Sequence, residues 1–200
     1  MDNNYTHVTV VLDSSGSMSD RKDETVQAYN ELLNGQRNVP GKMTYSLYLF
    51  NRNVYPMRHF VDLNSIDNLS VSEYIPASTT ALNDAICRAI DETGLALSKM
   101  REFERPSKVI LVIITDGFEN SSSMFTEKQR DKKIRHQREV YNWEVMFIGC
   151  DEHQVKEYEN LWGLPPHAAV YTAVNALGQT LRGDVSAYVT RCRTTGDNAQ

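Results

Sequence analysis

Three short polar clusters in the 200-residue sequence combine carboxylates with hydroxyls. They read DSSGS at residues 13–17, TT at residues 79–80 and TDG at residues 115–117. Every side chain in them that could hold an ion offers an oxygen atom, and none is a histidine or a cysteine. Mg²⁺ prefers oxygen ligands in octahedral geometry, and Mn²⁺ suits the same donors. The residue types therefore indicate a site for one of these two ions.

The first cluster has the spacing of a metal-binding turn. Asp13, Ser15 and Ser17 occupy alternate positions, and a turn can aim such side chains at a common point. Gly16 between them permits the backbone conformation that such a turn needs. Two carboxylates and three hydroxyls, taken from the three clusters together, would leave a coordination position of the ion open. An acidic group of a partner could fill that position.

Strands and helices must bring the three clusters to one place. Helical spacing of apolar residues predicts helices at residues 19–38, 80–104 and 126–141, and further helices around residues 155–162 and 177–188. Apolar runs predict strands at residues 6–12, 43–50, 54–61, 109–114, 145–148 and 168–172.

This alternation of strands and helices predicts an α/β fold, a mostly parallel sheet with helices on both faces. Residues 109–114 are the most apolar run and are expected to form a central strand. Pro56 marks residues 54–61 as the one antiparallel strand, at an edge of the sheet. Ligands of such sheets bind beyond the carboxyl ends of the strands, where the clusters at residues 13–17 and 115–117 fall.

Composition excludes several classes of protein. The chain has 26 acidic and 21 basic residues, a formal charge of −5, which argues against nucleic acid as a partner. Its three cysteines have no CxxC spacing, which argues against a disulfide framework and a zinc site. With no signal-peptide pattern and no apolar run near the roughly 20 residues that span a bilayer, we expect a soluble cytoplasmic protein without membrane contact. We expect one domain at residues 1–192 and a flexible tail at residues 193–200.

The order and spacing of the clusters resemble the von Willebrand factor type A (VWA) domain with its metal-ion-dependent adhesion site. Residues 13–17 fit that family's DxSxS motif, TALNDA at residues 80–85 is similar to its TxLxDA segment, and VIITDG at residues 112–117 is similar to its strand that ends in TDG. The resemblance runs from residue 6 to about residue 191. It implies the Rossmann-like VWA fold and a Mg²⁺ or Mn²⁺ site formed by five residues, which are Asp13, Ser15, Ser17, Thr80 and Asp116.

The same resemblance implies how the ligands divide. Ser15 and Ser17 would coordinate the ion directly, and the other three ligands would do so directly or through water. Residues 118–122 and 147–149 look like a bacterial and phage stand-alone branch, which would act in the cytoplasm of the host if a phage encodes it. The chain departs from the family where Ala-Ser-Thr precedes Thr80 in place of glycines, and at Asn83 and Phe118. These departures change the rim of the site, and none of them touches a proposed ligand.

A protein-binding module without catalytic activity is the function that these features favour, with a partner's Asp or Glu completing the metal sphere. One alternative is a structural or assembly protein whose metal site is degenerate or only stabilises the fold. Another is a Mg²⁺-dependent phosphotransferase with a nucleophilic aspartate. That chemistry needs a second carboxylate two residues after the first, where this chain has Ser15. Phosphate-binding GxxxxGK and dinucleotide-binding GxGxxG loops are absent from the sequence.

Five further features have simpler interpretations. Thr80 could act only as a helix cap, and Asp116 could belong only to a turn. Asp84 is expected to bond backbone amides or a ligand hydroxyl rather than the metal. Cys150 follows a strand and is expected to be a buried free thiol rather than a nucleophile. Residues 128–138 carry six bases and one acid, and we expect a solvated outer helix face there with i,i+4 pairing.

Overall fold

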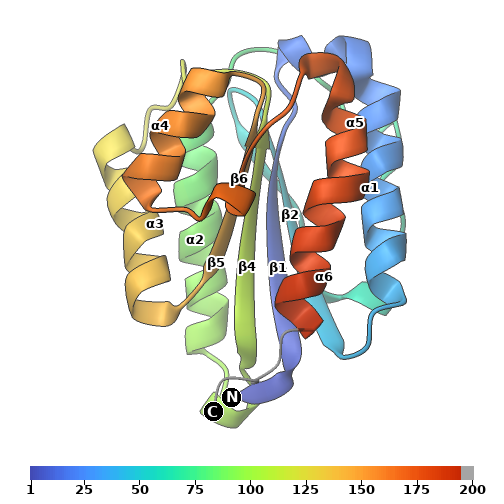
Figure 1. Ribbon diagram of the computed structural model, residues 1–200, viewed down its shortest axis with the longest axis vertical. Coiled ribbons are helices and arrows are strands. Elements are labelled where there is room, and N and C mark those ends of the chain that lie inside the picture. The colour runs from blue at the N-terminus through green and yellow to red at the C-terminus, as the bar shows by residue number, and fades with distance from the viewer. Residues whose placement is uncertain (195–200) are drawn as a thin grey trace.

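A single six-stranded sheet organises the computed structural model, which describes residues 1–194 (Figure 1). The strand order is β3-β2-β1-β4-β5-β6, and each neighbouring pair is parallel except β2 with β3. The predicted fold class is therefore confirmed, including the antiparallel edge strand. The strands are β1 (Asp2–Asp13), β2 (Lys42–Phe50), β3 (Val54–Asp62), β4 (Pro106–Thr115), β5 (Glu144–Gly149) and β6 (Ala169–Tyr171).

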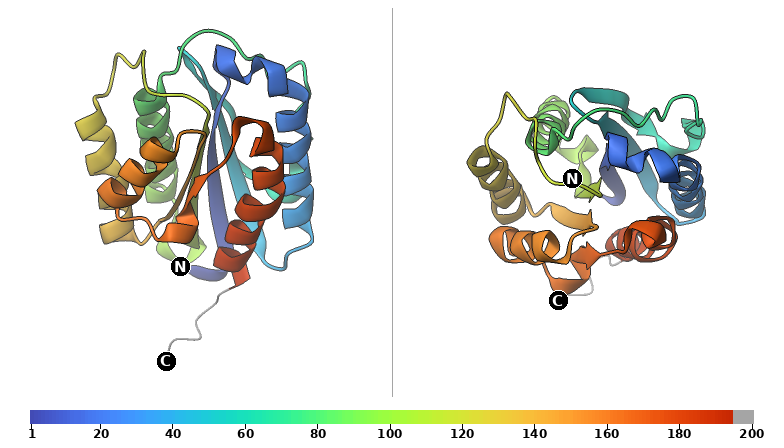
Figure 2. Two further views of the ribbon diagram at one scale, coloured as in Figure 1. Left: turned by 45° about the horizontal axis from the view of Figure 1, so that its top comes forward. Right: turned by 90° about the horizontal axis from the view of Figure 1, so that it is seen from above.

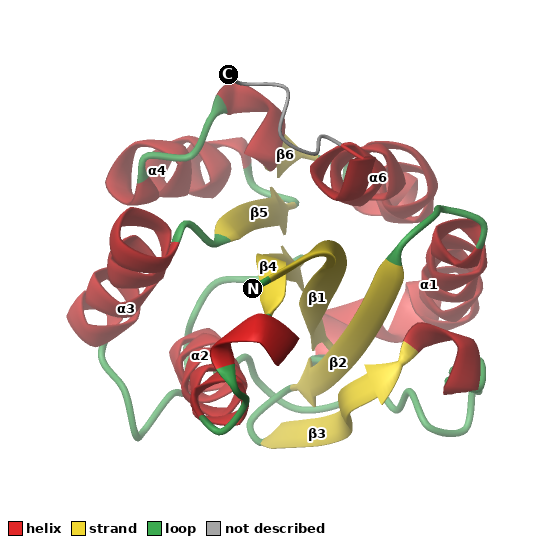
Figure 3. Cartoon of the chain, turned by 90° about the horizontal axis from the view of Figure 1, so that it is seen from below, coloured by secondary structure: helices red, strands yellow, loops and turns green. Residues whose placement is uncertain are grey.

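Helices cover both faces of this sheet. Figure 3 shows α2, α3 and α4 on one side and α1 and α6 on the other. A π-helical turn, Leu181–Val185, joins α5 to α6. Short 3-10 helices occur at Gly16–Arg21, Leu63–Ser65, Glu102–Glu104, Pro166–Ala168 and Val174–Ala176. The α-helices are α1 (Lys22–Arg37), α2 (Leu82–Ser98), α3 (Glu127–Tyr141), α4 (Glu152–Trp162), α5 (Leu177–Thr180) and α6 (Ser186–Thr194).

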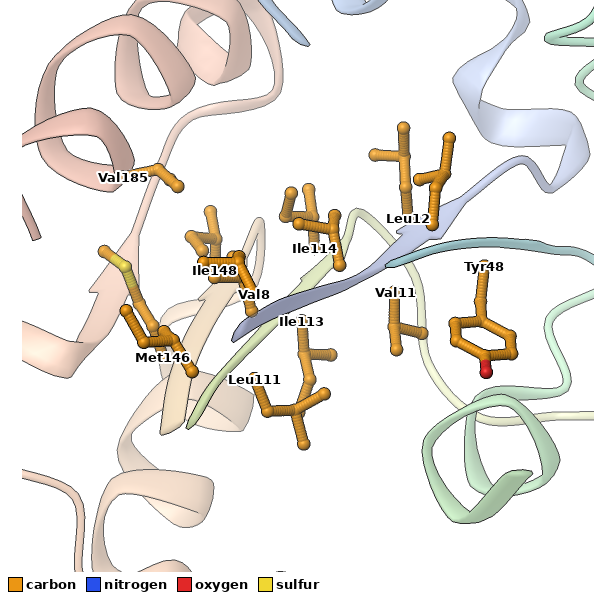
Figure 4. Close-up of a cluster of buried hydrophobic side chains, with 14 of the residues drawn as sticks. Val8, Val11, Leu12, Tyr48, Leu111, Ile113, Ile114, Met146, Ile148 and Val185 are labelled. Carbon is orange, nitrogen blue, oxygen red and sulfur yellow. The ribbon is translucent and has the colours of Figure 1, made fainter. Parts of the chain in front are cut away.

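The core lies in two layers, one on each face of the central strands. Successive residues of a strand point to opposite faces, so both layers draw on the same strands. In β1, Val11 points to the face that α2 covers and Leu12 points to the opposite face (Figure 4). Their partners on β4, Ile113 and Ile114, follow the same alternation, and all four side chains are buried. This packing fixes β1 and β4 side by side, and therefore fixes where both strands end.

Two predicted helix ends differ from the structure. The helix predicted to run to residue 104 ends at Ser98, and a separate 3-10 turn follows it. Pro106 opens β4 and disfavours the helical conformation of Arg105 before it, so a helix is not expected to continue into β4. At the other end of the chain, α6 continues through Thr194, two residues past the boundary expected for the tail. Residues 195–200 of that expected tail lie outside the described residues.

Helix α3 is less solvated than predicted. Lys128, Lys132 and Arg135 are exposed as expected, but Arg130 is buried. Its guanidinium donates to Asp131 on the same helix and lies 4.6 Å from the ring centre of Tyr158 on α4. The interpretation of residues 128–138 as an outer face is therefore wrong at this position, because α4 packs over it. None of the helices within residues 1–194 has both the length and the apolar character needed to cross a membrane.

Candidate metal centre

The three polar clusters meet at the carboxyl end of the central strands, the upper end in Figure 1. Because β1 and β4 are parallel neighbours with Leu12 opposite Ile114, the residues that follow the two strands emerge side by side. The loop before α2 crosses over the end of β1, as the view from above in Figure 2 shows. Backbone hydrogen bonds from Ala77 to Ser14 (2.9 Å) and from Gly16 to Ser78 (3.0 Å) hold that loop in place.

A chain of hydrogen bonds links four of the five proposed ligands. The Ser15 amide donates to Asp13 Oδ1 at 2.7 Å, which turns the backbone back toward the carboxylate. The hydroxyls of Ser15 and Ser17 lie 3.1 Å apart, and Ser17 Oγ donates to Asp116 Oδ1 at 2.6 Å. The alternate spacing of the first cluster thus aims its side chains at Asp116, which is 99 residues further along the chain.

Thr80 reaches the same place from the loop before α2. Its hydroxyl lies beside the turn after β4, since a methyl group at Gly117 would be 3.4 Å from Thr80 Oγ1. The Thr80 amide donates to Asn120 Oδ1 at 2.8 Å, and the Asn120 amide donates to the Thr80 carbonyl at 3.0 Å. Thr80 precedes α2, and Ala81 in the N-cap position makes no side-chain cap, so Thr80 does not serve as that cap.

Gly16 serves the turn through close packing rather than through its backbone conformation. It does not have a positive φ, whereas Ser78 opposite it has φ of 66°. A side chain on Gly16 would bring a carbon to 3.3 Å from the Ser78 carbonyl oxygen. The glycine is therefore needed for the approach of the two loops, and the strained backbone lies in the loop before α2.

Burial is the main cause of the pKa shift of Asp13. Its side chain is fully buried, which raises its pKa to about 6. Hydrogen bonds from Thr115 and Ser15 oppose that shift, and the nearby charge of Asp116 adds to it. Thr115 Oγ1 donates to Asp13 Oδ2 at 2.5 Å. A divalent cation beside this carboxylate would stabilise the charge that burial disfavours.

Arg21 is a component of the site that sequence reasoning missed. Its guanidinium donates to Asp116 Oδ2 at 2.5 Å, and the side chains of Arg21 and Asp116 are only 14% and 2% exposed. Arg21 ends the 3-10 helix Gly16–Arg21 that begins inside the DxSxS motif. A basic residue one short helical turn after the motif was the available signal.

Two acidic residues hold the loop that follows Asp116. Glu119 accepts the amides of Asn83 and Ser122, and thereby joins the start of α2 to this loop. Asp84 accepts the amides of Ser123, Met124 and Phe125, so the expectation that it bonds backbone amides is confirmed. Both carboxylates are occupied in shaping the rim.

The residues present fit Mg²⁺ or Mn²⁺. All five side chains offer oxygen, and three segments distant in sequence converge on one point at the molecular surface, where Ser17 is exposed. Within residues 1–194, no three His, Cys, Asp or Glu side chains gather as a metal site. The oxygen donors of the five side chains suit Mg²⁺ or Mn²⁺ better than the Cys and His ligands typical of zinc sites would.

Cys150 lies near this centre without the properties of a nucleophile. It is a free, partly buried thiol, and burial raises its pKa to about 11. A thiol with so high a pKa stays protonated and unreactive at neutral pH. The simpler interpretation of Cys150 is therefore the one that the structure favours.

Comparison with solved structures gives the same fold. A von Willebrand factor type A protein from Catenulispora acidiphila superimposes with a TM-score of 0.62 at 15% identity, covering 94% of this chain and 42% of that one. Proximal thread matrix protein 1 from the mussel byssus gives 0.65 at 14% identity, with 93% and 47% covered. Manganese-loaded TRAP protein of Plasmodium vivax gives 0.56 at 16% identity, with 91% and 75% covered. The chain thus spans less than half the length of the first two.

Sequence comparison identifies the family. No curated protein matches the chain. The family model of the von Willebrand factor type A domain matches residues 7–182, which include all three polar clusters. With the sheet order, the helices on both faces and the position of those clusters already established, we conclude that the chain belongs to the von Willebrand factor type A domain family.

Proposed function

We propose that this protein is a metal-dependent binding module in which an Asp or Glu of a partner protein completes the coordination of Mg²⁺ or Mn²⁺. The proposed ligands are Asp13, Ser15, Ser17, Thr80 and Asp116. The observation that carries the proposal is their convergence at the exposed carboxyl edge of the sheet, linked by hydrogen bonds between residues 99 positions apart. When bound, the ion would act as a Lewis acid that attracts an anionic side chain.

Two structurally similar proteins support a divalent ion at this place. One crystal form of proximal thread matrix protein 1 has a zinc-occupied MIDAS motif, and the TRAP structure is manganese-loaded. The oxygen ligands of this chain favour Mg²⁺ or Mn²⁺ over zinc. We further propose a cytoplasmic location, which is supported by three thiols that are free of disulfides.

Catalysis is not part of this proposal. Ser15 stands where a phosphotransferase would need a proton-transferring carboxylate, and its hydroxyl is paired with Ser17 at 3.1 Å. Asp84 and Glu119, which follow Thr80 and Asp116 in the chain, are held by backbone amides. A binding role uses the cluster as it is, whereas a proton-transfer role would need a free acid or base.

Capture of partners tests the proposal. Immobilised wild-type protein is exposed to lysate in Mg²⁺ and in EDTA, beside Asp116→Asn and the matched control Asp67→Asn, which alters an exposed loop carboxylate. We expect a partner that is retained by the wild type and Asp67→Asn, and lost both in EDTA and with Asp116→Asn. Replacing the acidic residues of that partner one at a time with amides should then abolish binding at a single position. Capture that persists in EDTA would contradict the mechanism.

A structural or assembly role remains the alternative. The observation that favours this alternative is that every proposed ligand except Thr80 has a hydrogen-bond partner within the cluster itself. In that case Mg²⁺ would stabilise the fold or leave it unchanged, and no partner would depend on it. The capture experiment separates the two functions, because only the binding module loses partners in EDTA.

A further inference from the structure

The ion pair between Arg21 and Asp116 places a fixed cation inside the proposed metal site. Arg21 Nη1 lies 2.5 Å from Asp116 Oδ2, while Ser17 holds the other oxygen of the same carboxylate. Both members of the pair are largely shielded from water, with side-chain exposures of 14% and 2%. Screening by solvent is therefore weak, and a second cation close to Asp116 experiences much of the guanidinium charge.

We propose that Arg21 determines the selectivity of the site, by opposing the divalent ion and by making the ion-bound site prefer an anionic partner. This inference rests on the proposed function. It adds a residue to the five ligands and assigns it an electrostatic role rather than a place in the coordination sphere.

The charge balance of the site explains the direction of both effects. The carboxylates of Asp13 and Asp116 together neutralise one divalent ion. Arg21 then leaves the occupied site with one positive charge in excess, and a single carboxylate from a partner restores neutrality. Without the guanidinium the occupied site would already be neutral, and a carboxylate would make it negative. Arg21 therefore disfavours the ion alone and favours the ion together with an acidic partner.

Geometry supports a competitive relation between the guanidinium and the ion. Asp116 has two oxygens, and the structure shows one accepting from Ser17 and the other from Arg21. An ion that ligates Asp116 directly must share or displace one of these donors, and Arg21 is a cation that the ion repels. Arg21 Nη1 also donates to Met18 Sδ at 4.0 Å, so its guanidinium contacts a buried side chain of its own 3-10 helix. The arginine is thus placed by the fold and is not a freely mobile surface group.

Isothermal titration with Mn²⁺ at pH 7.5 tests the first effect. The proteins are wild type, Arg21→Gln, Arg21→Met, Arg21→Lys and a matched control, Arg101→Gln, which removes an equal charge from an exposed pair with Glu104. We expect Mn²⁺ to bind the two neutral variants at least about tenfold more tightly than wild type. Repulsion between like charges a few Å apart is large enough to weaken the affinity of wild type by that factor. Arg21→Lys and Arg101→Gln should stay near wild type.

A carboxylate probe tests the second effect. The titrations are repeated in sodium acetate and in sodium chloride of equal ionic strength, and circular dichroism checks that each variant is folded. Acetate should strengthen Mn²⁺ binding by wild type and Arg21→Lys more than by the two neutral variants. If Arg21 had a merely structural role, both neutral variants would bind Mn²⁺ more weakly than wild type. Acetate would then strengthen Mn²⁺ binding equally in all the proteins.

The outcomes separate this inference from the proposed function. Equal or weaker Mn²⁺ binding by the neutral variants, or an equal effect of acetate on all proteins, would overturn the role of Arg21 while leaving the metal site intact. Absence of Mn²⁺ binding by every protein would contradict the proposed function and this inference with it. Using two neutral replacements keeps the test valid if one of them fails to fold.

Discussion

Thr115 illustrates how a residue outside the proposed ligand set controls one inside it. Its side chain is fully buried at the end of β4, and its hydroxyl donates to Asp13 Oδ2 while the Gly117 amide donates to that hydroxyl at 3.2 Å. The hydroxyl thus orients the carboxylate of β1 and the turn that carries Asp116. Loss of such a supporting hydrogen bond typically lowers metal affinity by about 10–100-fold.

Replacing this hydroxyl should damage both stability and metal binding. Thr115→Val leaves a buried Asp13 oxygen without its donor, for which we expect a loss of about 1–3 kcal/mol in the free energy of unfolding. We also expect Mn²⁺ affinity to fall by roughly 10-fold or more. Thr93→Val is the matched control, because Thr93 is equally buried and bonds Thr9 at 3.0 Å away from the site. If both variants bound Mn²⁺ as wild type does, Thr115 would have no part in the site.

The structure places all five proposed ligands at one end of the sheet. Residue types and alternate spacing indicated Asp13, Ser15 and Ser17, and the ends of the predicted strands indicated the cluster that contains Asp116. The choice of Thr80 and Asp116 as individual ligands followed from the family resemblance, because nothing local in the sequence relates positions so far apart. Arg21 was missed because its partner is 95 residues away, and its position one short helical turn after the motif does not by itself point to Asp116.

At the scale of elements, the loop after β4 is held by the start of α2. Asp84 in the first turn of that helix accepts amides from Ser123, Met124 and Phe125. This bond set stabilises the segment between the TDG turn and α3, whose own N-terminus has a capping box formed by Thr126 and Gln129. Asp84 therefore helps to fix the position of the site's rim, together with Glu119.

Removing that carboxylate should release the loop. For Asp84→Ala we expect a loss of about 1–3 kcal/mol in unfolding free energy, because three loop amides lose their charged acceptor. Amide hydrogen exchange at residues 123–125 should accelerate strongly. Asp91→Ala on the same helix is the control, since Asp91 makes a surface pair with Lys133 that is worth about 0–1 kcal/mol. Unchanged exchange in Asp84→Ala would contradict this role.

His7 on β1 gives the fold a pH dependence remote from the site. Its ring is fully buried, stacks on Phe60 at 3.6 Å and approaches the hydroxyl of Thr44 at 2.8 Å. Burial, assisted by the charge of His59, lowers its pKa to about 3. In the unfolded chain His7 has the ordinary histidine pKa of about 6.5. Below that pH the unfolded chain therefore binds a proton at His7 that the folded chain does not bind. Stability contributed by His7 is therefore complete above the unfolded pKa and falls as pH drops from about 6.5 towards 3.

The size of this effect can be measured. Between pH 7 and pH 5 the linkage amounts to about 2 kcal/mol of unfolding free energy. His7→Gln should lose that part of the pH dependence, although its stability at pH 7 will also be lower. Urea denaturation at several pH values gives both quantities. The same slope in wild type and in His7→Gln would show that the histidine does not titrate as the structure indicates.

Periodicity located every strand of the sheet, yet helix ends and burial required tertiary information. The alternation in residues 43–50 and Pro56 in the next strand sufficed to predict the antiparallel edge. By contrast, nothing in the polar sequence of α3 indicated that Arg130 would be enclosed by Tyr158 and Trp162 of α4. Burial of a cation depends on which helix packs over it, and that partner lies about 30 residues further along the chain.

Across the whole molecule, metal binding and folding should be linked. An ion that binds only the folded chain stabilises it by about 2.7 kcal/mol at 100 times its Kd, which for a protein of this size raises Tm by about 5–10 °C. We expect this shift for wild type and for Asp67→Asn in Mg²⁺ or Mn²⁺, measured by differential scanning calorimetry. Asp116→Asn should show little or none. Equal shifts in all three proteins would place the ion elsewhere.

The direct test of the metal centre is anomalous diffraction from crystals grown in Mn²⁺. We expect one strong peak at the carboxyl edge of the sheet, in contact with the hydroxyls of Ser15 and Ser17 and near Asp13, Thr80 and Asp116. We also expect a further ligand position that faces solvent, where a partner carboxylate could bind. A manganese peak at another place, or none at saturating Mn²⁺, would contradict the assignment of these five residues.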